Sequence, residues 1–367
     1  MRVIISAGGT GGHIYPALAI INKIKEKEPN SEFLYIGTTD RMEKDLIPSL
    51  GINYVGIEMK GLDRRNLLKN FKVLSLYSKA KKKIKEEIQK FNPDVVIGVG
   101  GYITLPVIET ASKLKYKTVI HEQNSIPGMS NKILSKKVNK VLVSLPGSME
   151  YFNKDKTVFT GNPRSEEIIS IKPIDKKELG LSKNKKLVVI VMGSLGSATI
   201  NEKEKELVKD FKNKDYEVIL VTGEKYFDDY KEIEVPKNVK VYPFLKNFIN
   251  VIKEADLIVS RAGASTIAEI TAIGLPSILV PSPYVTNNHQ YKNAKELEDN
   301  GCSKILLEEE FNSENLIKLI DEILNDEKEY KKMRESAKKL GIENSATKVY
   351  NEIKKVVDEK WKNFLKK

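Results

Sequence analysis

The feature that most constrains this chain is a recurring pattern in which a short apolar run ends at glycines and a helical pattern follows. A helix is indicated after the first such run, because apolar residues between positions 15 and 27 recur at helical spacing. Short apolar strands that alternate with helices predict a parallel sheet that is covered by helices on both faces. The expected strands of the first half cover residues 2–6, 32–37, 94–99, 118–121 and 140–143.

The second half repeats the pattern, which predicts a second doubly wound α/β domain. We place the boundary near Gly161-Asn162-Pro163, giving domains 1–162 and 163–344 within 367 residues. A helix at about 345–367 is free to pack back on the first domain. Ligands of open parallel sheets lie beyond the carboxyl ends of the strands, so we expect the chemistry in an interdomain cleft. The expected strands of this half cover residues 187–192, 217–222, 239–242, 257–260 and 277–280.

Composition excludes several classes of protein. Hydrophobic residues make up 40% and charged residues 31%, which is typical of globular proteins. No apolar run approaches the roughly 20 residues of a membrane span, and the first apolar stretch is too short for a signal peptide, which favours the cytosol. The single cysteine, Cys302, excludes an intramolecular disulfide. The net charge of +12 fits either an anionic partner or a lysine-rich solvated surface.

Three glycine-rich turns follow predicted strands. Residues 8–12 read GGTGG, residues 98–102 read GVGGY, and residues 193–196 read GSLG. Backbone without Cβ atoms can bring its N–H groups close to an oxyanion, and a following helix adds the positive end of its dipole. The first turn is not a P-loop, because it lacks the Gly-Lys-Ser/Thr ending. Each turn is therefore a candidate phosphate site or a tight turn without a ligand.

The segment 256–290 is the most informative part of the second half. Its strand ends at Arg261, and we expect Ser265 and Thr266 to begin a helix, with Glu269 in the first turn. The carboxylate of Glu269 could accept hydrogen bonds from vicinal hydroxyls, or the three residues could form only a capping box. The loop 281–290 then offers amides suited to sugar hydroxyls, although an ordinary polar loop would look similar.

Together these motifs resemble a specific family. GGTGGH at 8–13, GVGGY at 98–102, HEQN at 121–124 and the segment 256–290 occur in the order found in the bacterial MurG family, the β-N-acetylglucosaminyltransferases that complete lipid II. The resemblance runs from residue 1 to about residue 345. It implies the GT-B fold, in which two Rossmann-like, doubly wound parallel-sheet domains face each other across a cleft.

The resemblance also implies the reaction. N-acetylglucosamine would pass from UDP-GlcNAc to the C4 hydroxyl of the muramoyl sugar of undecaprenyl-diphospho-MurNAc-pentapeptide (lipid I), with inversion. The family needs no metal or other cofactor, and the sequence shows no DxD motif at a strand end near the glycines. An inverting transfer needs a base for the acceptor hydroxyl and stabilisation of the leaving diphosphate.

Matching motifs indicate the site residues. Glu269 would hold the ribose, and Leu245 would read the uracil edge through its backbone. The sequence departs from the family's GGSxGA at 192–198, where it reads MGSLGSA, and an amide often stands at the Leu195 position. The acceptor diphosphate would lie against Gly9, Thr10, Gly100, Gly101 and Tyr102. The donor would contact Thr10, Gly11, Gly12, Asn124, Arg164, Ser194, Leu245, Arg261, Ala264, Ser265, Thr266, Glu269 and Gln290.

The three histidines are not equal candidates for the catalytic base. His13 ends the first glycine turn and has a pKa range suited to base work, although it could instead only position the turn. His121 stands at a strand end, where a structural role and a catalytic role are both open. His289 is expected to shape the amide loop.

An apolar stripe rimmed by cations predicts a membrane-binding helix. Leu67, Leu68, Phe71, Leu74 and Tyr77 recur at helical spacing among arginines and lysines. Such a helix would place the enzyme peripherally on the cytoplasmic face of the cell membrane, with the anionic inner leaflet as partner. The alternative is a helix that turns this stripe toward the core.

Three other functions remain as alternatives. A GT-B transferase that makes a glycolipid would share the second-domain signature, but it has no acceptor diphosphate to hold. A UDP-GlcNAc 2-epimerase would need a set of carboxylates that the sequence does not show. A nucleic-acid-binding protein would explain the charge of +12, but the chain lacks aromatic-basic interleaving, so no nucleic acid partner is expected.

Overall fold

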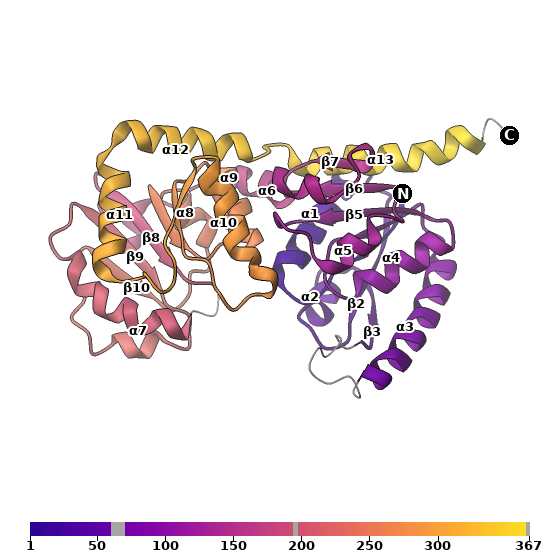
Figure 1. The fold of residues 1–367 in the computed structure, drawn as a ribbon, viewed down its shortest axis with the longest axis horizontal. Helices are drawn as coiled ribbons and strands as arrows, with labels where there is room; N and C mark the ends of the chain where they lie inside the picture. The colour runs from indigo at the N-terminus through magenta and orange to yellow at the C-terminus, as the bar shows by residue number, and fades with distance from the viewer. Residues whose placement is uncertain (60–69, 194–196, 365–367) are drawn as a thin grey trace. The chain divides into compact units, whose positions relative to one another are not determined.

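The computed structural model describes residues 1–59, 70–193 and 197–364. The chain divides into two compact units, which are treated separately below. Unit 1 contains Met1–Arg164 and Asn344–Lys367, and unit 2 contains Ser165–Glu343. In each unit, helices pack around a parallel sheet (Figure 1).

Unit 1 is built, in its described residues, on a seven-stranded sheet in the order β3-β2-β1-β4-β5-β6-β7, with every neighbouring pair parallel. The expected strands are confirmed to within one residue at each end, whereas β3 and β7 were not expected. The strands are β1 Arg2–Ser6, β2 Glu32–Thr38, β3 Asn53–Ile57, β4 Val95–Gly98, β5 Lys117–Glu122, β6 Lys140–Val143 and β7 Thr157–Phe159. The α-helices are α1 Gly11–Lys27, α2 Glu43–Ser49, α3 Asn70–Phe91, α4 Thr104–Lys113, α5 Met129–Leu134, α6 Arg164–Ser170 (which crosses the unit boundary) and α13 Ser345–Phe364.

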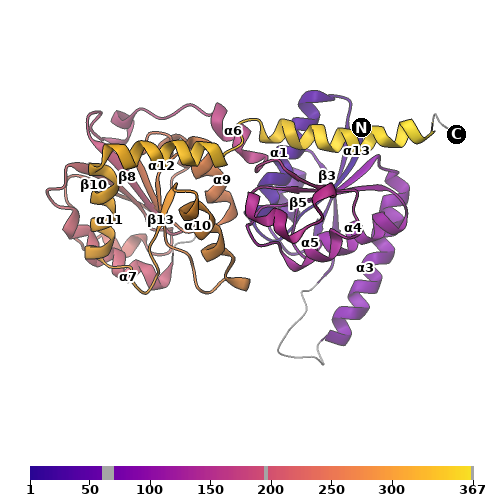
Figure 2. The same cartoon turned by 45° about the horizontal axis from the view of Figure 1, so that its top comes forward.

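Two apolar layers cover the faces of this sheet. One layer joins the sheet to α1 and α13, and the other joins it to α3, α4 and α5. The C-terminal helix α13 packs on α1, beside which it lies in both Figure 1 and Figure 2. Polar contacts join these two helices, since Glu28 accepts a hydrogen bond from the Tyr350 hydroxyl at 3.0 Å and pairs with Lys354 at 3.2 Å.

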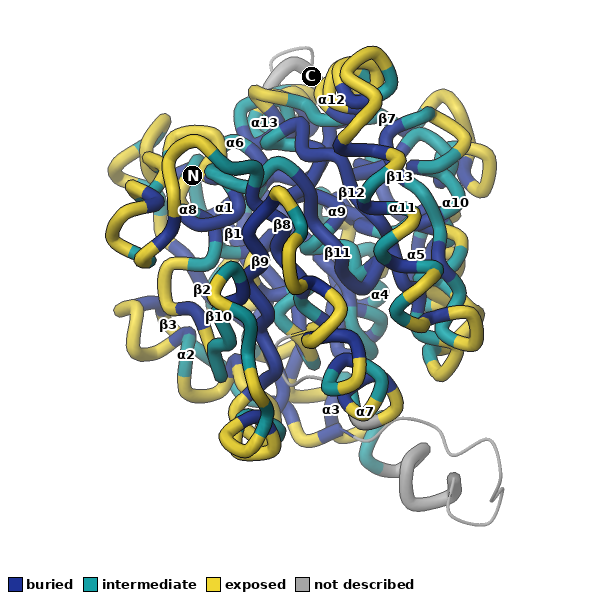
Figure 3. Tube along the Cα trace, turned by 90° about the vertical axis from the view of Figure 1, so that its left-hand side faces the viewer, coloured by how far each residue is buried: buried dark blue, intermediate teal, exposed yellow. Residues whose placement is uncertain are grey.

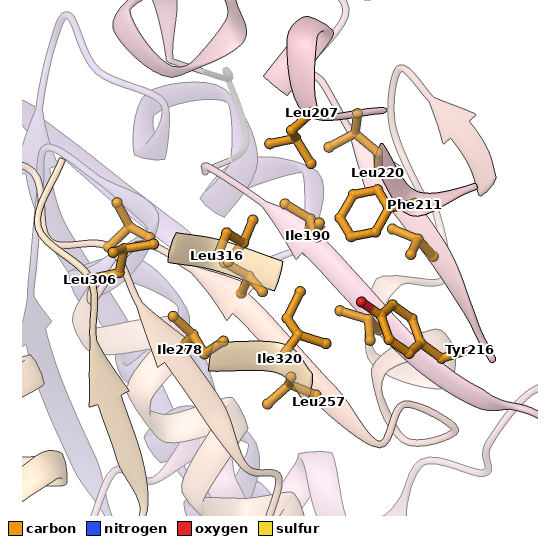
Figure 4. Close-up of a cluster of buried hydrophobic side chains, with 14 of the residues drawn as sticks. Ile190, Leu207, Phe211, Tyr216, Leu220, Leu257, Ile278, Leu306, Leu316 and Ile320 are labelled. Carbon is orange, nitrogen blue, oxygen red and sulfur yellow. The ribbon is translucent and has the colours of Figure 1, made fainter. Parts of the chain in front are cut away.

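Unit 2 contains, within the described part of the chain, a six-stranded parallel sheet in the order β10-β9-β8-β11-β12-β13. Figure 4 shows part of its core, where side chains from α11 meet those of the sheet. The last strand, β13, was not expected. The strands are β8 Lys186–Val191, β9 Tyr216–Val221, β10 Val239–Tyr242, β11 Leu257–Ser260, β12 Ser277–Leu279 and β13 Ser303–Ile305. The α-helices are α7 Ala198–Leu207, α8 Phe248–Ile252, α9 Ala264–Ile273, α10 His289–Asp299, α11 Ser313–Asn325 and α12 Glu327–Leu340.

The strand order of each sheet contains one switch point. In unit 1 the chain builds outward from β1 to β3 and then returns to place β4 on the other side of β1, and unit 2 repeats this with β8 and β11. The paired strands end level, because Ser6 pairs with Gly98 and Ser260 with Val191. Strands β1, β8 and β11 are coloured as buried along most of their length in Figure 3. Switch points of this kind are where open α/β sheets bind ligands beyond their carboxyl ends.

Candidate functional site

The two glycine turns of unit 1 interlock at the switch point. The N–H of Gly8 donates to the carbonyl of Gly100 at 3.2 Å. A Cβ on Gly101 would lie 2.4 Å from the Gly8 oxygen, and a Cβ on Gly100 would lie 2.4 Å from Cδ2 of His13. Both glycines also have positive φ, at 112° for Gly100 and 87° for Gly101. Only glycine fits where the two turns approach this closely.

The helix that follows the first turn begins earlier than expected. Helix α1 starts at Gly11 rather than near residue 15, with Thr10 as its N-cap residue. The N–H groups of His13 and Ile14 both point back to the carbonyl of Thr10, at 3.1 and 3.2 Å. Glycines lower helix propensity but do not prevent a first turn, whose N–H groups have no partner within the helix. Gly11, Gly12 and His13 are therefore helical.

A buried carboxylate that no sequence motif singles out lies behind the first turn. Glu43, at the start of α2, is fully buried. Its Oε1 accepts hydrogen bonds from the N–H and the hydroxyl of Thr38, at 3.2 and 2.7 Å. Its Oε2 accepts a longer bond from the N–H of Gly9, at 3.4 Å. Glu43 thus connects the turn to the end of β2.

The geometry of His13 defines its tautomer. Nδ1 lies 3.1 Å from the carbonyl oxygen of Gly8, which can only accept a hydrogen bond. Nδ1 therefore carries the proton, and Nε2 is the basic nitrogen. This arrangement suits a base that is held by its own turn, and it equally suits a residue that supports the turn.

His121 is a structural residue. It is completely buried, with Nε2 3.2 Å from the Gly161 oxygen and Nδ1 2.9 Å from Nε2 of Gln123. Burial lowers the pKa of His121 to about 4, so the ring is neutral near pH 7. Both ring nitrogens are used within the fold, and no face of the ring is open to a substrate.

Asn124 is held by its neighbour Glu122, whose role the sequence did not reveal. Oε1 of Glu122 accepts the backbone N–H of Asn124 at 3.0 Å and its side-chain Nδ2 at 3.2 Å. Oε2 accepts from the N–H of Gly128 at 3.0 Å and from Asn131 at 2.9 Å. The HEQN motif is therefore a hydrogen-bonded unit with Asn124 at its exposed end, since Asn124 is only partly buried.

Arg164 lies close to the start of α1. Its guanidinium carbon is 4.7 Å from the ring centroid of Tyr15. The same ring packs against the first turn of the helix, because a Cβ on Gly11 would lie 2.9 Å from Tyr15 Cε2. Tyr15 thus brings Arg164 and the glycine turn together, which the sequence order alone did not indicate.

The start of α9 in unit 2 corrects two expectations. The helix begins at Ala264 with Gly263 as its N-cap residue, so Ser265 and Thr266 are already inside it. Gly263 has extended backbone, and no side chain caps this end, which excludes the capping box. Glu269 is buried and lies in the second turn rather than in the first. Glycine is among the residues favoured at the N-cap position, and the extended backbone of Gly263 occupies it without a side-chain hydrogen bond.

Arg261 makes its contacts within unit 2. Its Nη1 donates to the Val280 oxygen at 3.1 Å and pairs with Glu308 at 2.6 Å, while Nη2 donates to the Ser197 hydroxyl at 2.8 Å. Leu245 lies buried in the loop between β10 and α8.

The amide loop differs in part from its expected form. His289 and Gln290 belong to the first turn of α10 rather than to a loop. His289 donates from Nδ1 to the Thr286 oxygen at 2.9 Å, and Gln290 accepts from the N–H of Ser282 at 2.9 Å. Between them and β12, Asn287 and Asn288 both have positive φ, at 57° and 51°. Asparagine is the side chain that tolerates this backbone best, so both amides mark a constrained turn.

Some predicted residues cannot be placed. Ser194, Leu67 and Leu68 lie outside the described residues, as do the side chains of Phe71 and Leu74. In the part of α3 whose side chains are described, residues 76–91, the helix faces the core through Ala80, Ile84 and Ile88, and Tyr77 packs against the same core. No described helix is long and apolar enough to cross a membrane. Among the residues that the structure describes, no group of three or more histidine, cysteine or acidic side chains is arranged to hold a metal ion.

Comparison with known proteins defines the class. Residues 3–143 match the glycosyltransferase family 28 N-terminal domain, and residues 187–351 match the C-terminal domain of the same family. Two Rossmann-like parallel-sheet domains with these signatures define a sugar-nucleotide-dependent glycosyltransferase of the GT-B fold.

Individual relatives narrow the class. The chain is 46% identical over 362 residues to a Bacillus cereus protein named UDP-N-acetylglucosamine–N-acetylmuramyl-(pentapeptide) pyrophosphoryl-undecaprenol N-acetylglucosamine transferase 1, with 97% of this chain and all of the relative covered. A Bacillus cytotoxicus protein of the corresponding name matches at the same identity and coverage. The crystal structure of Acinetobacter baumannii MurG superimposes with a TM-score of 0.78 at 27% identity, covering 96% of this chain and 99% of that one. This chain belongs to the MurG family of glycosyltransferase family 28.

More distant structures share the fold alone. One is the crystal structure of a putative UDP-N-acetylglucosamine 2-epimerase from Listeria monocytogenes. It has a TM-score of 0.71 at 17% identity, covering 98% of this chain and 97% of that one. At that identity the likeness carries no statement about activity.

Proposed function

We propose that this chain transfers N-acetylglucosamine from UDP-GlcNAc to the C4 hydroxyl of the muramoyl sugar of lipid I, with inversion, to give lipid II for peptidoglycan synthesis. The observation that carries the proposal is the pair of interlocked glycine turns at the β1/β4 switch point, with His13 at their junction. The near full-length identity to enzymes named for this transfer supports the choice of donor and acceptor.

The donor would use turns from both switch points. The first turn of α9, from Ala264 to Thr266, offers backbone N–H groups and a helix dipole to the diphosphate of UDP. Glu269 would hold the ribose and Leu245 the uracil edge. The sugar would contact amide and hydroxyl groups. The residues proposed for the donor are Thr10, Gly11, Gly12, Asn124, Arg164, Ser194, Leu245, Arg261, Ala264, Ser265, Thr266, Glu269 and Gln290.

The acceptor diphosphate would lie against the interlocked turns of unit 1. The first N–H groups of α1 are directed to this end of the sheet, and Gly9 has the positive φ of 99° that such a concave backbone requires. Tyr102 follows Gly101 and is partly exposed. The residues proposed for this contact are Gly9, Thr10, Gly100, Gly101 and Tyr102.

The transfer itself is one displacement. The C4 hydroxyl oxygen of the acceptor forms a bond to the anomeric carbon from the face opposite UDP, and the bond from that carbon to the UDP oxygen breaks. The hydroxyl proton passes to Nε2 of His13, which its tautomer leaves basic. The negative charge that develops on UDP is stabilised by helix N-terminal N–H groups, so no metal or other cofactor is needed.

We further propose that the enzyme works peripherally at the cytoplasmic face of the cell membrane. Its lipid acceptor requires access to that surface, and the stripe of Leu67, Leu68, Phe71 and Leu74 among cations suits an anionic leaflet. No nucleic acid is expected as a partner. Cosedimentation with vesicles that contain anionic lipid tests this, and unchanged binding by a folded variant with Leu67→Glu and Phe71→Glu would contradict it.

The decisive experiment is transfer of labelled N-acetylglucosamine from UDP-GlcNAc to a lipid I analogue in the presence of EDTA. We expect a β-linked disaccharide product at the same rate with and without added Mg²⁺. Folded enzyme that forms no product would contradict the function, and a rate restored only by Mg²⁺ would contradict metal-independent catalysis. Conversion of UDP-GlcNAc to its 2-epimer without acceptor would indicate the epimerase instead.

A further inference from the structure

Four side chains in unit 2 form a closed polar ring at the β8/β11 switch point. Nη2 of Arg261 donates to Oγ of Ser197 at 2.8 Å, and Oγ of Ser197 lies 3.2 Å from Oγ1 of Thr199. The hydroxyl of Thr199 donates to Oε1 of Glu308. Oε2 of Glu308 lies 2.6 Å from Nη1 of Arg261 and closes the ring as an ion pair. We call these four residues the Arg261 ring.

The chemistry of the four groups permits only one direction of donation. The single proton of Thr199 goes to the carboxylate of Glu308, so the hydroxyl of Ser197 must donate to Thr199. Ser197 can then receive the guanidinium N–H of Arg261. Every hydrogen bond therefore runs from the cation toward the anion, an arrangement in which each bond strengthens the next. The direction of the whole chain depends on the carboxylate of Glu308.

The ring ties together three segments that are distant in the sequence. Arg261 follows β11, Ser197 is the N-cap residue of α7 after the second-domain glycine turn, and Glu308 follows β13. The backbone oxygen of Glu308 also accepts a hydrogen bond from Lys203 of α7, at 2.8 Å. The start of α7 is thus attached to the rest of unit 2 through both the side chain and the backbone of Glu308.

Burial makes Glu308 the effective counter-ion of Arg261. The side chains of both residues are about one-tenth exposed, so solvent screens their pairing only weakly. A second carboxyl that interacts with the guanidinium, that of Glu204 on α7, is still more deeply buried. Desolvation raises the pKa of Glu204 to about 8, which leaves it mostly protonated at neutral pH.

We propose that Glu308 is a positioning residue for the donor. It orients the Arg261 guanidinium and, through Thr199 and Ser197, holds the start of α7 in the position that receives the diphosphate of the sugar nucleotide. This inference rests on the proposed function, because it concerns the same donor site. Glu308 itself would not touch the donor.

The test compares Glu308→Gln with the same substitution at its exposed neighbour Glu309. Glutamine cannot accept the Thr199 proton and also pair with the guanidinium. If its oxygen accepts from Thr199, its NH₂ group faces the N–H groups of Arg261, and two donors then meet. We expect the KM for UDP-GlcNAc and the Kd for UDP to rise about tenfold, the scale of one lost charged contact. The acceptor KM and kcat should stay close to those of Glu309→Gln, whereas the melting temperature should fall, because the substitution breaks a buried ion pair.

A second pair of variants covers the case in which Glu308→Gln does not fold. Thr199 is exposed, and Thr199→Val removes its hydroxyl at nearly constant volume, whereas Thr199→Ser keeps it. We expect the valine variant to bind UDP about threefold more weakly and the serine variant to restore binding. Provided that the wild type binds UDP, two outcomes would overturn the inference. One is equal donor binding in Thr199→Val and Thr199→Ser, and the other is equal donor binding in the Glu308 and Glu309 variants. A wild type that does not bind UDP would contradict the proposed function and this inference together.

Discussion

The described residues that follow β1 and those that begin α7 after β8 occupy equivalent places in their sheets but are held in different ways. The turn after β1 is held by backbone contacts with a second turn, since Gly8 bonds to the carbonyl of Gly100 and Gly101 packs against the Gly8 oxygen, and the carboxylate of Glu43 supports it from behind. The turn after β8 ends at Ser197, which is held by the side chains of the Arg261 ring. No described atom lies within 4 Å of a Cβ placed on Gly193.

This difference indicates a division of labour. A turn held by backbone contacts keeps a fixed shape, which suits the place where a base must meet an acceptor hydroxyl within hydrogen-bonding distance. A turn held by an ion pair and hydroxyls depends on charge and can respond to an anionic ligand. The chemical step should therefore be sensitive to changes in the first turn, and donor affinity should be sensitive to changes in the second.

Removal of the basic nitrogen from the first turn should have the largest effect. We expect His13→Ala to lower kcat by about 10²–10⁴-fold, the usual cost of losing a general base. His13→Asn separates the two roles of His13, because its amide N–H can still donate to the Gly8 oxygen although it offers no base.

Steady-state kinetics with both substrates distinguishes the outcomes. If His13 is the base, the alanine and asparagine variants should be equally slow, with the KM for UDP-GlcNAc nearly unchanged. Recovery of kcat in His13→Asn would instead show that His13 only supports the turn. A kcat within about threefold of wild type in both variants would exclude His13 as the base.

Alanine substitutions at one glycine of each unit should lower the unfolding free energy by different amounts. Gly101→Ala forces a Cβ to within 2.4 Å of the Gly8 oxygen at a φ of 87°, so the interlocked turns must move apart. We expect unit 1 to lose about 3 kcal/mol or more of unfolding free energy. Among the described atoms Gly193→Ala meets no close contact, so the expected cost in unit 2 is that of its φ of 94°, about 1 kcal/mol.

Thermal or denaturant unfolding with hydrogen-exchange mass spectrometry assigns each loss to its unit. Gly128→Ala is the control, because its φ of −61° suits alanine, no described atom lies within 4 Å of the new Cβ, and the N–H that bonds to Glu122 is kept. Equal destabilisation by Gly101→Ala and Gly193→Ala would show that the two turns are not held differently.

The sequence predicted the parts of this molecule that depend on local pattern. Apolar runs located strands to within one residue, and glycines located the turns at their ends. The carboxylates that hold those turns were missed, because Glu43 lies 34 residues from Gly9 and Glu308 lies 109 from Thr199. Their contacts depend on which strands are neighbours, and periodicity along a single chain does not contain the strand order.

Helix starts show the same limit on a smaller scale. The expected start of α1 near residue 15 was wrong because the glycines before it were interpreted only as a turn, whereas Gly11 and Gly12 are helical. Glu269 was assigned to a first turn because the side chains of Ser265 and Thr266 suggested a cap, but the backbone of Gly263 takes that position. Where backbone geometry rather than a side chain ends an element, the residue types carry little signal.

The pH dependence of stability should also differ between the two units, and this is the smallest of the expected effects. In unit 1, burial lowers the pKa of His121 to about 4, below the value of about 6.5 in an unfolded chain. The unfolded chain then binds the proton first, so unit 1 should lose stability as the pH falls from 6.5 toward 4, by up to about 1.4 kcal/mol per pH unit. In unit 2, the pKa of Glu204 is raised from 4.5 to about 8, so the folded state holds a proton that the unfolded chain releases. Unit 2 should therefore lose stability as the pH rises from about 4.5 to about 8.

Hydrogen exchange of peptides from each unit between pH 4.5 and 8, corrected for the intrinsic exchange rate, measures these opposite slopes. Glu204→Gln keeps the shape of the side chain and cannot ionise, so it should flatten the slope of unit 2 and stabilise that unit at pH 8. Glu206→Gln, an exposed position on the same helix, is the matched control and should leave the slope as it is. Parallel slopes in the two units, or a slope in unit 2 that survives Glu204→Gln, would mean that the carboxyl beneath the Arg261 ring is ionised. Two carboxylates would then share one guanidinium, and Glu308 would no longer be its principal counter-ion.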